Sequence, residues 1–177
     1  MISNFSKIVI DNGGRILPLV IDPTPTNGTG LTNPSIFINN DKVLVNLRHV
    51  QYTLYHGENE HKYQNALGGP LIYLHPEDDL TLRTVNYLCE LDPNTLEITS
   101  TSKVDTSKLD KEPLWEFIGL EDARVVKWDN KLYLSGVRRD TTTDGEGRME
   151  LSEIVDGKEI SRVRIEPPTP TYCEKNW

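Results

Sequence analysis

The sequence is poor in the features that mark several large protein classes. It contains no run of about 18 apolar residues, so it predicts no membrane-spanning helix. Residues 1–14 hold one lysine and a three-residue apolar run, which does not predict a secretory signal. Lys and Arg (19) are fewer than Asp and Glu (27), and the net charge of −8 argues against binding to nucleic acid or to an anionic membrane.

Cysteine and metal-ligand patterns are scarce as well. Cys89 and Cys173 are far apart and form no Cys-x-x-Cys motif, so we expect reduced thiols in a cytoplasmic protein rather than a disulfide. No segment has the amphipathic pattern of a three-turn helix. The histidines have no spacing of a standard ligand set, so neither a metal site nor a cofactor is predicted; they are His49, His56, His61 and His75.

Short apolar runs separated by turn residues make up most of the chain, which predicts an all-β fold. The clearest example is the stretch 119–137, where two apolar runs flank the turn residues 129–131. Residues 51–70 predict an excursion from the sheet, and residues 105–118 a linker. Further strands are expected at 36–38, 43–50, 71–74, 84–91, 96–104, 149–155 and 158–165, with an edge strand at 8–10.

An internal repeat relates two of these hairpins. The sequence NPSIFINNDKVLVNLRH aligns with DARVVKWDNKLYLSGVR, so that Asn33 matches Asp122 and Lys42 matches Lys131, an offset of 89 in both cases. Each copy is followed by a second hairpin. Two copies of a four-stranded antiparallel unit joined by linkers are typical of propeller blades. A β-sandwich is the alternative.

The domain organisation follows from this repeat. We expect residues 1–177 to form a partial β-propeller domain, with blade one at about 31–104, blade two at about 119–166 and the start of blade three at 172–177. Because blades have about 40–50 residues each, two blades cannot close a ring. The chain is therefore expected to be a fragment, or to be completed by a further chain segment or a homo-oligomer.

Three motifs resemble glycoside hydrolase family 130 in the same order. They are TNPSIFIN with VLVNLR, GLEDARV with KLYLSGV, and CEKNW. The family's usual form of the second motif has Pro where this chain has Ala123. The resemblance implies a five-bladed propeller and a carbohydrate-active protein, most often an inverting phosphorylase of β-mannosides and in some members a hydrolase.

The resemblance also implies roles for particular residues. Asp122 falls on the general acid of the family, and Asn33 and Arg48 fall on residues that hold the sugar. The remaining implied substrate-binding residues adjoin the acid or belong to the third motif, and they are Glu121, Arg124, Lys175 and Asn176. Inorganic phosphate would be the co-substrate of a phosphorylase, with an oligosaccharide or small glycoside as the partner.

The chemistry sets conditions on these side chains. Cleavage of a glycosidic bond needs a proton donor near the leaving oxygen and a nucleophile on the other face of the ring. Glu121 and Asp122 are adjacent in a strand, so they are expected on opposite faces, with Asp122 in the pocket and Glu121 in a structural hydrogen bond or bound to Arg124. Phosphate as nucleophile requires basic side chains, among which Arg48 is the candidate.

Simpler interpretations remain open. Glu121 and Asp122 would form a solvated strand end, and Arg48 an ordinary surface residue, if the motifs carried no chemistry. Whether the chain is an enzyme is therefore uncertain. The alternative from another class is a non-catalytic carbohydrate-binding or assembly propeller that keeps the pocket without the reaction.

Overall fold

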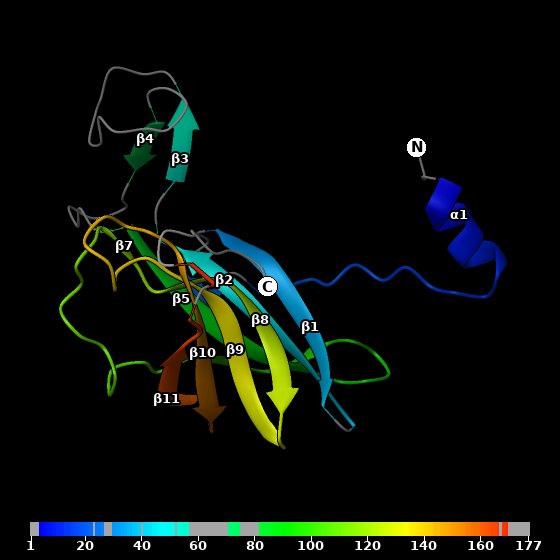
Figure 1. The fold of residues 1–177 in the computed structure, drawn as a ribbon. Coiled ribbons are helices and arrows are strands. Elements are labelled where there is room, and N and C mark those ends of the chain that lie inside the picture. Colours follow the sequence, from blue (N-terminus) through cyan, green and yellow to red (C-terminus); the bar gives the residue numbers. More distant parts are fainter. Residues whose placement is uncertain are drawn as a thin grey trace.

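The computed structural model describes residues 4–22, 24–26, 30–39, 41–51, 53–56, 71–74, 82–166 and 168–169. In these ranges the chain is mostly β-strand in antiparallel sheets (Figure 1), as the sequence predicts. The elements in chain order are α1 (Asn4–Asp11), the 3-10 helix η1 (Thr24–Thr26), β1 (Leu31–Asn39), β2 (Lys42–Val50), β3 (Thr53–His56), β4 (Leu71–Leu74), β5 (Leu82–Leu91), β6 (Ile98–Lys103), β7 (Phe117–Ile118), β8 (Leu120–Trp128), β9 (Lys131–Arg138), β10 (Arg148–Val155) and β11 (Lys158–Arg164).

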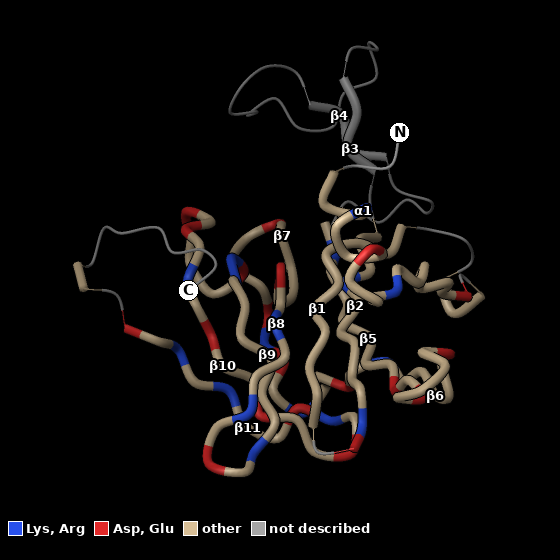
Figure 2. The backbone as a smooth tube through the Cα atoms, turned by 90° about the vertical axis from the view of Figure 1, so that its right-hand side faces the viewer, with Lys and Arg blue, Asp and Glu red and all other residues tan. Residues whose placement is uncertain are grey.

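Two sheets form the body of the molecule. The first sheet has the strand order β1-β2-β5-β6, with the short β7 added in parallel to β5, and the second sheet has the order β11-β10-β9-β8. Figure 2 shows the two sheets side by side, with β1 and β8 facing each other where they meet. No closed sheet forms among the described residues.

The first hairpins of the two sheets repeat each other in position as well as in sequence. β8 begins and ends 89 residues after β1 (120 − 31 and 128 − 39), and β9 begins 89 residues after β2 (131 − 42). The hairpin predicted around residues 129–131 is confirmed, although Lys131 already pairs with Trp128, so that the turn consists of Asp129 and Asn130, both with positive φ. Asp156 and Gly157 form the turn between the strands predicted at 149–155 and 158–165, and both also have positive φ. Turns of this kind suit Asp, Asn and Gly because these residues tolerate the left-handed conformation.

Apolar side chains pack on both faces of the first sheet. One cluster lies between the two sheets and includes Leu120, Ala123, Val125 and Leu134, with Phe37 packed against it. The second cluster lies on the other face of the first sheet, where the N-terminal segment packs against it; its buried members are Val43, Val45, Leu47, Cys89 and Leu91. Burial raises the pKa of the free Cys89 thiol, an effect that its contact with Thr101 opposes; Cys173 lies outside the described residues.

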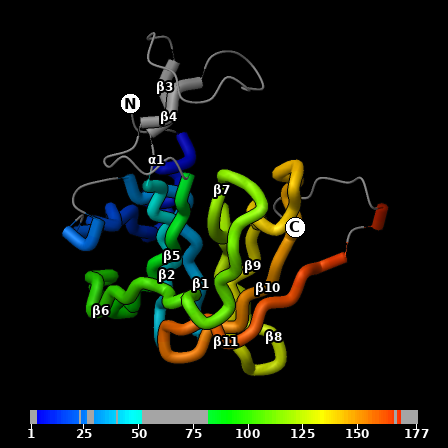
Figure 3. Tube along the Cα trace, turned by 90° about the vertical axis from the view of Figure 1, so that its left-hand side faces the viewer, coloured from blue at the N-terminus to red at the C-terminus, as the bar shows by residue number. Residues whose placement is uncertain are grey.

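Residues 105–118 join the two sheets. They run from β6 to β7 across the side of the molecule that faces the viewer in Figure 3. Asp105 donates its amide to Gly157 O and accepts from Glu159 N through its carbonyl, both at 2.9 Å. The segment therefore continues from β6 to the hairpin of the second sheet. It then ends in β7, which pairs with the start of β5. This predicted linker thus contains one short strand.

The N-terminal prediction is wrong, because residues 8–10 belong to helix α1 and not to an edge strand. Figure 1 shows α1 apart from the sheets. The helix ends at a glycine pair: Gly13 has a φ of 78°, and Gly14 N donates to Val9 O at 2.8 Å. This is a helix C-cap geometry. The sequence Asn-Gly-Gly after the apolar run was the signal for it. None of the helices in the described part of the chain is long and apolar enough to cross a bilayer.

The excursion predicted after β2 contains a separate two-stranded sheet, formed by β3 and β4. The strand predicted at 71–74 is therefore present, but it pairs outside the two main sheets. The strands predicted at 84–91 and 96–104 correspond to β5 and β6. The first sheet consequently has the same four-stranded order as the second.

Candidate functional site

Two β-bulges lie next to each other where β1 and β8 begin. The Asn33 bulge (residues 32–35) and the Asp122 bulge (residues 121–124) interrupt the pairing register at matching positions of the repeat. The φ angle is 47° at Asn33 and 50° at Asp122. Asn and Asp reach this left-handed region more readily than other residues with a Cβ atom, because their short polar side chains bond locally. The sequence repeat is thus also a repeat of backbone conformation.

Asp122 is at the centre of the site. Asn33 Nδ2 donates to Asp122 Oδ1 from the other sheet, and Arg48 Nη1 donates to the same oxygen at 2.8 Å. Asp122 is 7% exposed and Arg48 8%, whereas Asn33 is exposed. The structure therefore brings together the three residues for which the sequence predicted the acid and the inner sugar contacts. The carboxylate lies between a buried guanidinium and a solvent-facing amide.

Arg48 is held in place by the strand beside it. Its Nε and Nη2 atoms donate to Thr84 Oγ1 on β5 at 3.2 and 3.1 Å. The side chain points between the two sheets and not to bulk solvent, so the interpretation of Arg48 as a surface residue is wrong. A guanidinium in contact with a carboxylate favours its charged form.

Glu121 lies on the same side as Asp122, which corrects the expectation of opposite faces. Its Oε2 atom is 3.4 Å from Arg48 Nη2, and its Oε1 atom is 3.8 Å from Arg139 Nε. Side chains alternate in a regular strand, but a bulge adds a residue and changes the local twist. At Asp122 the positive φ adds to this change. Two neighbouring carboxylates therefore converge on one guanidinium.

Arg124 is exposed and points to the Asn33 bulge, where Nη1 donates to Pro34 O at 3.1 Å. The expected bond between Glu121 and Arg124 is therefore replaced by the ion pairs of Glu121 with Arg48 and Arg139. The other two predicted substrate-binding residues, Lys175 and Asn176, lie outside the described residues.

Two glycines make room for this geometry. A Cβ atom at Gly136 would lie 2.6 Å from Glu121 O and 3.1 Å from Ala123 Cα, so β9 passes directly against the Asp122 bulge. Gly119 has a φ of 102°, and a Cβ there would lie 2.2 Å from Thr84 O. The sequence analysis gave neither glycine a role, although Gly119 belongs to the motif GLEDARV and Gly136 to KLYLSGV.

Arg139 is a site residue to which the sequence motifs gave no role. Its side chain is 30% exposed beside Glu121, and Nη1 donates to Gly145 O at 2.8 Å. The adjacent Arg138 is 4% exposed. The dipeptide at the end of β9 was the available signal, but only the structure shows which of the two arginines faces the Asp122 bulge.

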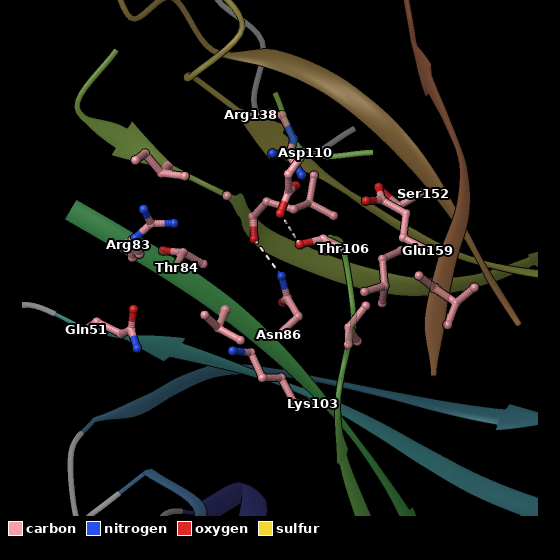
Figure 4. A pocket seen from close by; sticks show the side chains of 17 residues that line it. Gln51, Arg83, Thr84, Asn86, Lys103, Thr106, Asp110, Arg138, Ser152 and Glu159 are labelled. Atoms are coloured by element: carbon pink, nitrogen blue, oxygen red, sulfur yellow. Dashed lines mark hydrogen bonds between the residues drawn. The ribbon is translucent and has the colours of Figure 1, made fainter. Parts of the chain in front are cut away.

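A polar cavity of about 170 Å³ lies between the sheets next to the site (Figure 4). Thr84 and Asn86 line it from the first sheet, and Arg138, Ser152 and Glu159 from the second. Glu159 is 1% exposed and accepts a hydrogen bond from Ser152. The sequence analysis assigned no role to these interior polar residues.

A wider crevice of about 760 Å³ continues along the second sheet. In its wall Arg138 is 3.1 Å from Asp140 Oδ2 and 3.0 Å from Glu150 Oε2. Burial raises the pKa of Glu150, while the charges of Arg138 and Arg162 oppose that rise. The crevice is thus lined by paired charges of both signs.

No group of three or more His, Cys, Asp or Glu side chains suited to a metal ion gathers within the described residues. His49 is buried, and burial lowers its pKa, with a further contribution from Lys103. It faces Tyr87 in an edge-on contact with ring centroids 6.1 Å apart. The side chains of the other histidines lie outside the described residues.

Comparisons with protein families, with curated proteins and with solved structures find no match. The resemblance to glycoside hydrolase family 130 therefore depends on the three sequence motifs alone.

Proposed function

We propose that the two four-stranded sheets are neighbouring blades of a five-bladed β-propeller. The equal strand order of the two sheets, the matching bulges and the meeting of β1 with β8 support this arrangement. In a propeller the first strand of each blade lines the axis, so equivalent residues of successive blades meet there. Further blades would come from another segment or from other copies of the chain.

The protein is proposed to act on carbohydrates, as an inverting glycoside phosphorylase of β-mannosides with Asp122 as the general acid. One observation carries this proposal: equivalent positions of two repeats place Asn33 and Asp122 in direct contact, with Arg48 on the same carboxylate oxygen. A strand end without function has no need for a carboxylate that is 7% exposed and bound by two side chains of the neighbouring sheet.

The proposed reaction uses one protein acid. Asp122 transfers its proton to the leaving glycosidic oxygen as the glycosidic C–O bond breaks, while a phosphate oxygen attacks the anomeric carbon from the opposite face. The new C–O bond joins sugar and phosphate with inverted configuration. Asn33, which is exposed and bonded to the acid, contacts the sugar in this scheme.

The arginines have separate roles in the proposal. Arg48 is buried and orients Asp122, and Arg139 is the more exposed cation that binds phosphate.

The test is incubation of the chain with β-mannobiose and phosphate, with mannose 1-phosphate followed by phosphorus NMR. Asp122→Asn is expected to lower the rate by at least about 100-fold, which is in the range of general acid catalysis. Asp129→Asn is the matched control, because Asp129 is an exposed turn residue on the same hairpin. Equal rates for both variants would exclude Asp122 as the acid.

A hydrolase of the same family would release mannose without phosphate, and the same experiment detects it. The second candidate function is a non-catalytic carbohydrate-binding or assembly propeller. It is favoured by the ion pairs that already occupy Asp122 and Glu121. Saturable sugar binding without turnover would support this candidate.

A further inference from the structure

Two buried asparagines of the first sheet reach across to the Asp122 bulge. Asn46 on β2 is 0% exposed and Asn86 on β5 is 7% exposed, and they are neighbours in space. Asn86 Nδ2 donates to Leu120 O at 2.8 Å (Figure 4). Asn46 Nδ2 donates to Ala123 O at 3.3 Å and to Asn86 Oδ1 at 3.0 Å.

The two carbonyl groups that receive these bonds lie on either side of Glu121 and Asp122. We propose that Asn46 and Asn86 are positioning residues, which hold the left-handed backbone of the Asp122 bulge and so aim its carboxylate at Arg48 and Asn33. The amides touch the backbone and not the carboxylate, so they act on the site only through Asp122. A residue with a φ of 50° keeps this conformation only where its surroundings enforce it.

The repeat supplies an internal comparison for this proposal. Asn46 corresponds to Ser135 in the second sheet (135 − 46 = 89), so the repeat does not conserve the amide. At the Asn33 bulge the carbonyl that corresponds to Ala123 O is Pro34 O, and it accepts a bond from the exposed Arg124. The buried amide pair therefore belongs to the bulge that carries the carboxylate.

The environment of Asn46 gives a second, independent argument. Its Oδ1 atom is buried and has no hydrogen-bond partner among the described residues. A buried acceptor without a partner is unfavourable, and an apolar residue at this interior position would avoid it. The bond that Asn46 donates to the bulge is the compensating interaction that an apolar residue cannot make.

The first test measures positioning without any activity. Asn46→Ala, Asn86→Ala and the control Ser152→Ala are compared with the parent by NMR; Ser152 is 2% exposed and bonded to Glu159, away from the bulge. Both asparagine variants are expected to speed amide exchange at residues 121–124 by about tenfold or more relative to residues 131–135.

Unchanged exchange at residues 121–124 in both asparagine variants would overturn the proposal, as would equal effects in Ser152→Ala. If an alanine variant does not fold, Asn86→Asp replaces it, since an ionised Asp has the same shape but cannot donate to Leu120 O.

The catalytic consequence rests on the proposed function and is tested separately. If the parent turns over β-mannobiose, both asparagine variants are expected to lose about 10- to 100-fold in kcat with KM little changed, because the acid is misplaced after the sugar has bound. A loss confined to KM would contradict positioning of the acid. If the parent shows no turnover, the proposed reaction fails, and the NMR results still decide whether the amides hold the bulge.

Discussion

The Asn33 bulge and the Asp122 bulge have the same backbone conformation but different surroundings. Both interrupt the register at the same repeat position and both place a residue near a φ of 50°. The Asn33 bulge is exposed and is held by an exposed arginine, whereas the Asp122 bulge is buried beneath the first sheet. The same backbone conformation therefore exposes Asn33 to solvent at one bulge and buries Asp122 at the other.

The two sheets also differ in the number of charged side chains that they bury. Among the described residues of the first sheet, Arg48 is the one buried side chain that carries a permanent charge. The second sheet and the loop after β9 bury many more charged side chains, namely Asp122, Arg138, Asp140, Arg148, Glu150, Glu153 and Glu159. Buried charges are costly unless they are paired. The stability of the second sheet therefore depends more on ion pairs than the stability of the first sheet does.

The largest effect is expected from Arg48→Met. The substitution leaves two carboxylates, at Asp122 and Glu121, without their shared guanidinium in a buried setting. Loss of one partner from a buried ion pair costs about 3–5 kcal/mol. Urea unfolding measures the change, with Arg124→Met as the control. Arg124 is exposed and its loss is expected to cost less than about 1 kcal/mol; equal losses would show that the two bulges do not differ in this way.

The next effect concerns the space beside the Asp122 bulge. Gly136→Ala is expected to cost about 1–3 kcal/mol, because the new Cβ collides with backbone atoms of the bulge. Thermal unfolding compares it with Gly30→Ala, where nothing lies within 4 Å of the added atom. A neutral Gly136→Ala would mean that the bulge can shift freely.

A smaller effect is expected from removing the amide at the exposed bulge. Asn33→Gly loses a hydrogen bond to Asp122 but suits the positive φ, so the expected net cost is about 1 kcal/mol. Asp122→Gly also suits the φ, yet it leaves Arg48 with one carboxylate fewer and is expected to cost more. Chemical unfolding measures the loss of stability in both variants. A larger loss for Asn33→Gly than for Asp122→Gly would contradict the expected difference between the two bulges.

The smallest effect is a pH dependence in the second sheet. Because burial raises the pKa of Glu150, the folded state holds this proton more tightly than the unfolded state does. The resulting stabilisation is complete below the unfolded pKa of about 4.5 and is lost as the pH rises through the folded pKa. Unfolding of wild type and Glu150→Gln from pH 4 to 7 should show the wild-type advantage falling with pH. An advantage that grows with pH would contradict the assigned direction.

Much of the fold follows from patterns in the sequence. Alternating apolar runs and the Asp-Asn and Asp-Gly turns predicted the hairpins, and the 89-residue offset predicted that Asn33 and Asp122 occupy equivalent positions. Residues 8–10 were misassigned because a short apolar run fits a strand and a helix equally well. The Gly13–Gly14 cap was the distinguishing signal.

The sequence predicted three members of the candidate site, Asn33, Arg48 and Asp122, but not their geometry. The alternation of side chains along a strand predicted Glu121 and Asp122 on opposite faces. A β-bulge breaks this alternation, and the only sign of it in the sequence was the match of Asn33 with Asp122. The partners of Glu121 and the buried amides of Asn46 and Asn86 come from distant strands. Such contacts depend on how the sheets pack, which no local pattern specifies.

The bond between Asn33 and Asp122 has a mechanical consequence, because each sheet contributes one of its two ends. Its length measures how closely the two sheets approach each other at β1 and β8. A local change in the spacing of β1 and β8 therefore also changes the contact at Asp122 Oδ1, the oxygen that Arg48 binds as well.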